Sequence, residues 1–351
     1  MPRGPLRFTP IVCENKKMTG PAEPSISSPY FLSALVGGRC DLHCPFCGSW
    51  RRPIPEMSGS QWAALWREWG AWLPGRHVTL AGGEPLLHPE IGLLVRSLKD
   101  TGLRASISTS GGPLTMEMAR LAAAWPLDGI TISLDAPAAL HDRLRGRAGL
   151  HDQCLRFIDY LKELRPELVI GVAAIICRAN LAVLAEHLEQ LLAKPQVDVI
   201  YLQAVVNLAG GPNLSAGAKS SFFPPAKKAE AFLDWLEERR RRTAKIVNTA
   251  RQIAAWRQYF RNSQTARQWS GECRVGDYTL NIAPNGDVVL CDFFSPIGNV
   301  TVNNVKDLWY GEQAARLREQ MRSCTRSCNC LINCGFDDLQ VRLFRLNDPA
   351  C

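Results

Sequence analysis

The sequence predicts an α/β fold in which helices cover a parallel β-sheet. Along the first 205 residues, segments with the pattern of strands alternate with segments of helical pattern, and we count six such units. Most of the expected strands are near-continuous apolar runs, which is typical of sheets buried on both faces. A chain of 351 residues, 46% hydrophobic and 21% charged, can also bury a large core.

The expected elements follow one another in a regular order. The strands cover residues 30–36, 76–81, 105–109, 129–134, 168–176 and 197–205. The helices between them cover residues 58–72, 89–101, 116–124, 150–164 and 181–192. Because parallel strands end at one edge of the sheet, polar residues that follow the strands are the candidates for a functional site.

Composition limits the class of protein. Residues 1–28 are rich in Pro, Gly and Ser without an apolar signal core, so we interpret them as a flexible lead-in to a cytoplasmic protein. No apolar run approaches the ~20 residues of a membrane span. Thirteen cysteines in such a chain indicate metal ligands rather than disulfides. The net charge of +8 mildly favours an anionic substrate or partner.

The densest positive charge is the run Arg239–Arg242, at the end of an amphipathic helix that carries Ala229, Phe232, Leu233 and Leu236. A helical segment is expected from residue 225 to about 260. We interpret the arginine run as a solvated helix end that suits the helix dipole. Nucleic-acid binding would need aromatic and basic residues interleaved on one face. Trp256 and Tyr259 hint at that pattern, but packing in the core explains them as well, so nucleic acid is not the expected partner.

Cys40, Cys44 and Cys47 follow the first expected strand, with three and two residues between them. Three soft thiolate ligands leave one position of a metal centre open, as in catalytic rather than structural sites. Core cysteines brought together by chance and a zinc site are the alternatives. After the next strand comes Gly82-Gly83-Glu84-Pro85, where two glycines let a ligand approach the backbone.

A second cysteine region starts at Cys273. Two apolar runs around Asn285-Gly286 predict a β-hairpin that brings Cys273 and Cys291 together at its outer ends. Four further cysteines follow within eleven residues: Cys324, Cys328, Cys330 and Cys334. Such density indicates a metal site, either an iron–sulfur cluster or structural zinc.

The Cys-x3-Cys-x2-Cys pattern, with Phe46 before its third cysteine and Gly82-Gly83-Glu84-Pro85 one strand later, resembles the radical S-adenosylmethionine (SAM) superfamily. The resemblance implies a partial (β/α)6 barrel over residues 29–206. It also implies that the three cysteines hold a [4Fe–4S] cluster whose open iron SAM chelates, and that the Gly-Gly-Glu-Pro loop binds the amino group of SAM.

Further SAM contacts are implied by the same resemblance. Ser108 and Ser110 stand where the family often contacts the ribose, and Leu202 would pack near the adenine. Ser133 in Ser-Leu-Asp, with Arg145 in His-Asp-x-x-Arg-Gly, would also contact SAM, Arg145 at the carboxylate. A surface salt bridge is the alternative for Arg145. We interpret Cys154 and Cys177 as core residues.

The C-terminal cysteines resemble a SPASM/Twitch extension, which implies an auxiliary [4Fe–4S] cluster over residues 269–340. We expect Cys273, Cys291, Cys330 and Cys334 as ligands, in preference to Cys324 and Cys328, with two incomplete clusters as the alternative. Residues 207–268 would form a loop and bridging helices, and residues 341–351 a tail.

The resemblance implies an enzyme that cleaves SAM reductively to a 5′-deoxyadenosyl radical, which takes a hydrogen atom from the substrate. A one-electron donor such as flavodoxin or ferredoxin would supply the electron. We expect oxidation or modification of a small natural product, sugar or peptide. The alternatives are a peptide maturase that crosslinks or epimerises, and a non-catalytic electron-transfer protein. No long module for recognising a leader peptide is seen ahead of residue 30, which weighs against a ribosomal peptide.

Overall fold

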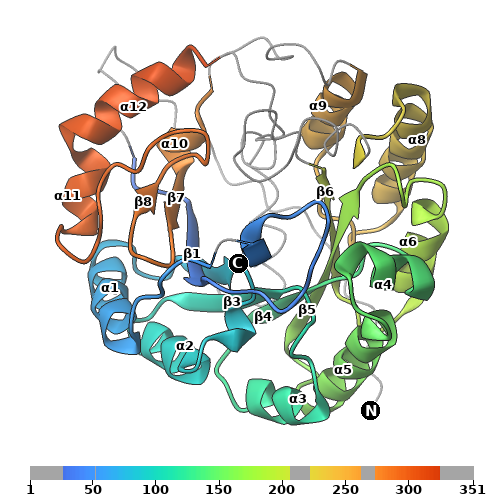
Figure 1. Ribbon diagram of the computed structural model, residues 1–351, viewed down its shortest axis with the longest axis horizontal. Helices are drawn as coiled ribbons and strands as arrows, with labels where there is room; N and C mark the ends of the chain where they lie inside the picture. Colours follow the sequence, from blue (N-terminus) through green and yellow to red (C-terminus); the bar gives the residue numbers. More distant parts are fainter. Residues whose placement is uncertain (1–26, 52, 206–221, 262–272, 325–351) are drawn as a thin grey trace.

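The computed structural model describes residues 27–51, 53–205, 222–261 and 273–324 of the chain. Its strands form one curved sheet in the order β6-β5-β4-β3-β2-β1-β7-β8, with helices around the outside (Figure 1). From β1 to β6, every neighbouring pair of strands runs parallel. The predicted α/β class and the partial six-stranded barrel are therefore confirmed.

The six barrel strands lie within two residues of the predicted ranges. They are β1 (Phe31–Gly37), β2 (His77–Gly82), β3 (Arg104–Thr109), β4 (Gly129–Ser133), β5 (Val169–Ile176) and β6 (Val199–Ala204). Most of their side chains are buried, as the near-continuous apolar runs predict. Their carboxyl ends carry the cysteine loop and the other polar candidates.

The barrel helices alternate with the strands and cover the outer face of the sheet (Figure 1). They are α1 (Gly59–Trp72), α2 (Ile91–Lys99), α3 (Met116–Ala123), α4 (Ala138–Arg145), α5 (Leu150–Leu164) and α6 (Leu184–Ala193), with short 3-10 turns at Ser49–Arg51 and Pro85–Leu87. Helix α1 begins at a capping box between Ser58 and Gln61. It buries Trp62, Trp66 and Trp69, which recur at helical spacing on one face.

The helical segment predicted from residue 225 to about 260 consists of two helices, α8 (Ala226–Arg242) and α9 (Ala250–Arg261). Between them the chain is extended and pairs with the outer edge of β6. The Ile200 N–H donates to the Lys245 carbonyl at 2.7 Å, and the Val247 N–H donates to the Ile200 carbonyl at 3.1 Å. These bonds to a distant strand override the local helical pattern and cover an otherwise open sheet edge.

The predicted hairpin forms from β7 (Thr279–Ile282) and β8 (Val288–Val289), which pair antiparallel. It does not stand apart from the barrel, because β7 also pairs parallel with β1, from Phe31↔Thr279 to Ala34↔Ile282. The extension continues with α11 (Val305–Tyr310) and α12 (Glu312–Arg322), after the single-turn α10 (Val275–Tyr278). The barrel sheet and the extension are therefore one continuous sheet.

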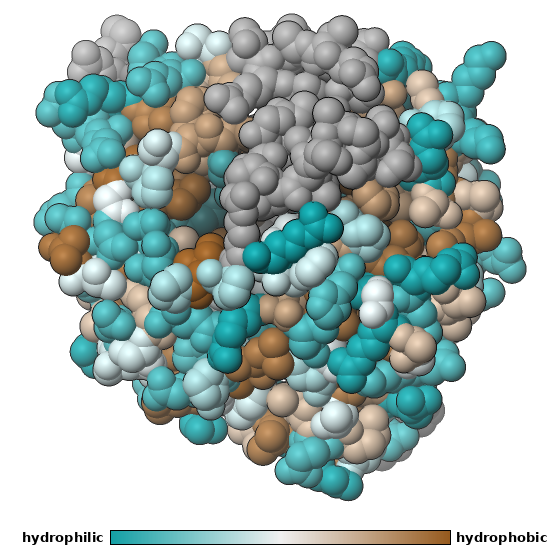
Figure 2. All heavy atoms as spheres, in the orientation of Figure 1, coloured by the Kyte–Doolittle hydropathy of each residue, from teal (hydrophilic) through white to brown (hydrophobic). Residues whose placement is uncertain are grey.

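Several charged residues of α8 and α9 form ion pairs. Arg239 pairs with Glu189 of α6 and Arg242 with Glu238 of α8, while Arg257 of α9 pairs with Glu237 of α8. Trp256 and Tyr259 are buried, which confirms their interpretation as core residues. On the face shown in Figure 2, hydrophilic side chains are frequent around the rim. Among the described helices, none is long and apolar enough to cross a membrane.

Candidate active site

The three cysteines of the first motif lie in the loop that leaves β1. Cys44 is buried, and Cys40 and Cys47 are half-buried. Burial raises the pKa of the Cys44 thiol to about 11. The nearby Arg145 charge lowers this pKa, and the charges of Cys47 and Cys40 raise it. The structure thus brings the three thiols together on one loop.

This loop is joined to the glycines that end β2. The Gly83 N–H donates to the Gly37 carbonyl and the Glu84 N–H donates to the Arg39 carbonyl, each at 2.7 Å. Gly82 has a φ of +124°, and a Cβ there would lie 2.3 Å from the Gly37 carbonyl oxygen. Only glycine accepts that backbone conformation and that close approach. The two predicted motifs therefore form one backbone surface.

Glu84 has no exposed surface, and both of its carboxylate oxygens accept hydrogen bonds. Oε1 accepts from the Thr109 hydroxyl at 2.8 Å and from the Leu86 N–H at 3.1 Å. Oε2 accepts from the backbone N–H and the hydroxyl of Ser110, at 2.8 and 2.6 Å. Burial raises the pKa of this carboxyl group, and these hydrogen bonds oppose the effect. Glu84 therefore ties the loop after β2 to the end of β3.

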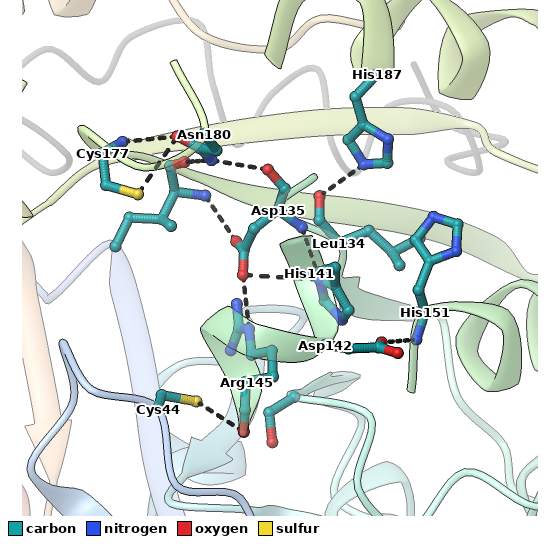
Figure 3. A network of polar contacts seen from close by, with 12 residues as sticks. Cys44, Leu134, Asp135, His141, Asp142, Arg145, His151, Cys177, Asn180 and His187 are labelled. Atoms are coloured by element: carbon teal, nitrogen blue, oxygen red, sulfur yellow. Dashed lines mark hydrogen bonds and ion pairs between the residues drawn. The ribbon is translucent and has the colours of Figure 1, made fainter. Parts of the chain in front are cut away.

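On the other side of the cysteine loop lies an ion pair between Asp135 and Arg145 (Figure 3). Arg145 Nε donates to Asp135 Oδ2 at 2.6 Å, and the two side chains are 11% and 0% exposed. The alternative of a surface salt bridge for Arg145 is therefore wrong. The guanidinium carbon also lies 5.5 Å from the centre of the Phe46 ring.

The backbone of Arg145 contacts the cysteine loop directly. Its carbonyl accepts a hydrogen bond from the His43 N–H at 3.3 Å and a longer one from the Cys44 thiol at 4.0 Å. Arg147 extends the contact, because its guanidinium donates to Asp41 at 3.2 Å and to the Gly112 carbonyl at 2.8 Å. The His-Asp-x-x-Arg-Gly segment thus holds the loop from the side opposite the glycines.

The remaining predicted residues lie on the strands around the loop. Ser108 and Ser133 are half-buried, and Leu202 is fully buried, with its N–H and carbonyl bonded to the Asn248 side chain at 2.8 and 3.0 Å. Cys154 and Cys177 are fully buried, which confirms them as core residues. Asp135 was missed as a site residue. The signal for it was present, because Asp135 is a charged residue directly after a buried strand.

The extension cysteines are described only in part. Cys273, Cys291 and Cys324 are half-buried, whereas Cys328, Cys330 and Cys334 lie outside the described residues. The antiparallel register Asn281↔Val289 brings the ends of β7 and β8 together, but α10 lies between Cys273 and β7. That Cys273 and Cys291 share a cluster therefore stays a prediction. The choice among the terminal cysteines stays a prediction.

The donor set at the first site fits an iron–sulfur cluster. In the described part of the chain, no three Cys, His, Asp or Glu side chains converge on a position for one metal ion. A four-iron cluster asks for a different arrangement, because each thiolate binds its own iron and the ligands stand further apart. Three thiols on one loop, beside backbone held open by glycines, suit such a cluster and a ligand next to it.

The comparisons with known families agree with this geometry. Residues 35–191 match the model of the radical SAM superfamily, and residues 273–335 match that of SPASM, an iron–sulfur cluster-binding domain. The chain belongs to the radical SAM superfamily and carries a SPASM extension. It is a radical SAM enzyme, whose cofactors are a [4Fe–4S] cluster and SAM, with auxiliary iron–sulfur binding in the extension.

Two curated proteins and one solved structure are similar to most of the chain. A PqqA peptide cyclase of Methylocella silvestris is 25% identical over 366 residues, covering 94% of this chain and 89% of that protein. A PqqA peptide cyclase of Rhizobium meliloti is also 25% identical, covering 93% and 88%. Streptococcus suis SuiB bound to precursor peptide SuiA has a TM-score of 0.65 at 16% identity, covering 87% of this chain and 71% of that one. The last likeness shows the fold.

Proposed function

We propose that this chain is a radical SAM peptide maturase, which crosslinks or otherwise modifies residues of a peptide substrate. The observation that carries the proposal is the similarity to PqqA peptide cyclases over 94% of the chain. The fold of SuiB, solved with a precursor peptide, supports it. The sequence alone favoured a small natural product or sugar and kept the peptide maturase as the alternative. These relatives favour that alternative.

Cys40, Cys44 and Cys47 would hold the [4Fe–4S] cluster, with Phe46 between the last two. When bound, the cluster and SAM supply reductive cleavage of SAM and abstraction of a hydrogen atom from the substrate. Gly82 and Gly83 expose backbone for the amino group of SAM, and Glu84 fixes that backbone through its bonds to the end of β3. Arg145 would bind the carboxylate of SAM.

Ser108, Ser110, Ser133 and Leu202 would line the rest of the SAM site. Ser110 would act while bonded to Glu84. In the extension, Cys273 and Cys291 would hold one auxiliary cluster with Cys330 and Cys334, in preference to Cys324 and Cys328. A flavodoxin or ferredoxin as electron donor, and a cytoplasmic location, stay predictions from the sequence.

The first experiment tests the enzyme on protein reconstituted without oxygen. Iron and sulfide are counted, and 5′-deoxyadenosine is measured after dithionite and SAM are added. We expect about eight irons per chain, falling by about four when Cys40, Cys44 and Cys47 are changed to alanine, with loss of the product. The matched control is Cys154→Ala, which removes a buried core thiol. Equal product from the triple variant and the control would refute the assignment.

The second experiment tests the substrate class. The enzyme is co-expressed with short peptides encoded beside its gene, and the peptides are analysed by tandem mass spectrometry. Crosslinking removes two hydrogen atoms, while epimerisation leaves the mass unchanged and is detected by chiral amino-acid analysis. Modification must disappear in the triple cysteine variant. Turnover of SAM without a change in any such peptide would count against the peptide maturase and favour the hypothesis of a small-molecule substrate.

A further inference from the structure

We infer that Asp135 is a positioning residue, which holds the Arg145 guanidinium in the orientation that binds the carboxylate of SAM. The inference rests on the proposed role of Arg145 as a SAM ligand. It adds a residue that does not itself touch SAM and whose effect passes through its partner.

Asp135 is fixed at all four of its polar atoms (Figure 3). Its N–H donates to His141 Nδ1 at 3.1 Å, and its carbonyl accepts from Asn180 Nδ2 at 2.7 Å. Oδ1 accepts the Ile175 N–H at 2.9 Å, and Oδ2 accepts Arg145 Nε at 2.6 Å. A carboxylate held in this way has one position, and this position determines where the Arg145 side chain that donates to it can lie.

Arg145 is held at both ends. Its carbonyl is bonded to the cysteine loop, and its Nε–H to Asp135, while the ring of Phe46 faces the guanidinium. A guanidinium is planar, so a short bond at Nε restricts the orientation of its plane. Its end-on pair of N–H groups is the geometry that binds a carboxylate with two parallel hydrogen bonds. This orientation is built before any ligand arrives.

Electrostatics keeps both partners ionised. Burial alone would raise the pKa of Asp135, but the Arg145 charge outweighs it and holds the pKa below its usual range. At neutral pH the carboxyl group is therefore an anion that balances a buried cation, and it is no source of protons. Without Asp135, the guanidinium would lack a counter-charge and would have to move toward water to be solvated.

The test is the dissociation constant of SAM, measured by equilibrium dialysis on oxygen-free, reconstituted protein without reductant. Asp135→Asn removes the charge, and Asp135→Glu keeps the charge but displaces it by one methylene. We expect both to weaken SAM binding about tenfold or more while iron content is retained. In an Arg145→Met background, adding Asp135→Asn should weaken binding no further, because Asp135 acts through Arg145.

The matched control is Asp198→Asn. Asp198 also accepts a strand N–H, that of Ile170, and a cation, Lys162 Nζ, both at 2.7 Å, but it precedes β6 at the opposite end of the barrel. It should lower the melting temperature without changing SAM affinity. SAM affinity within twofold of wild type in Asp135→Glu, or equal losses with and without Arg145, would overturn the inference alone. Wild-type protein that binds no SAM would overturn the proposed function as well.

Discussion

Ser110 and Glu84 are joined by two hydrogen bonds to one oxygen, since the N–H and the hydroxyl of Ser110 both donate to Glu84 Oε2. The bonds link the loop after β2 to the end of β3. Glu84 is in turn bonded through its N–H to the cysteine loop after β1. One buried residue therefore links three neighbouring strand ends, two through its carboxylate and the third through its backbone N–H.

Replacing the carboxylate of Glu84 should loosen the contact between the loop after β2 and the end of β3. In Glu84→Gln, an amide NH₂ would replace one oxygen and face hydrogen-bond donors, so we expect the free energy of unfolding to fall by about 1–3 kcal/mol. Urea denaturation of the protein without cluster measures it. Ser110→Ala, which deletes one of the donors, should cost about 1 kcal/mol. Unchanged stability in Glu84→Gln would show that the carboxylate does not hold the loops.

Gly83→Ala should prevent assembly of the cluster site. A Cβ at Gly83 would lie 2.4 Å from the Arg39 carbonyl oxygen, so the cysteine loop would have to move. We expect the reconstituted protein to lose about four irons per chain. Gly75→Ala is the control. Its φ of +73° means that the change costs about 1 kcal/mol of stability, but a Cβ added there would have no neighbouring atom within 4 Å. Equal iron in both variants would contradict the close approach.

Stability should fall in mild acid because of three buried histidines. Burial is the main cause that lowers the pKa of His141 and of His187 from 6.5 to about 4, and burial also lowers the pKa of His77 well below 6.5. The unfolded chain therefore binds protons first, so this stability is complete above pH 6.5 and is lost as the pH falls toward 4. Between pH 7 and pH 5 we expect a loss of about 2 kcal/mol for each histidine.

Denaturation midpoints measured at both pH values check this expectation. His187 Nε2–H donates a hydrogen bond to the Leu134 carbonyl at 3.3 Å, which the side-chain amide of a glutamine can reproduce without a titrating group. His187→Gln should therefore remove about a third of the pH dependence. The same loss of stability in the variant and the wild type would assign the pH dependence to other groups.

The extension should come loose locally when Arg318 is replaced. Arg318 is 2% exposed and donates to the carbonyls of Gly276 and Trp309, at 2.9 and 2.8 Å, which ties α12 to α10 and α11. Arg318→Met would leave both carbonyls unpaired, and we expect a cost of about 2–4 kcal/mol. Hydrogen exchange should rise in residues 305–322 and stay unchanged in β3 to β5. Uniform exchange across the chain would contradict a local role.

The barrel strands could be predicted from sequence because each is a buried apolar run with its own local signal. The cysteine and glycine motifs could also be located, since short spacings bring their residues together on neighbouring loops. The partner of Arg145 could not be deduced in this way. Asp135 lies ten positions earlier, and whether the two meet depends on how α4 returns toward the end of β4.

Long-range strand pairing was the other limit. The hairpin was predicted from its turn, but nothing in residues 279–282 indicates that their other edge pairs with β1. Residues 243–249 were also predicted within a helical segment, but in the structure Lys245 and Val247 form backbone hydrogen bonds with β6. In both cases, pairing with a strand far away in the sequence determined the conformation, and the local residue pattern did not indicate that pairing.

The position of β1 also orders the events of synthesis. Its neighbour β2 leaves the ribosome soon after it, but its other neighbour, β7, is made more than 200 residues later. At 5–20 residues per second, one edge of β1 waits roughly ten seconds to a minute for its partner. The cysteine loop grows out of that same strand, so during this interval the cluster ligands sit on an unfinished edge. The strand that carries the cluster ligands therefore gains its second neighbour only after β7 has been made.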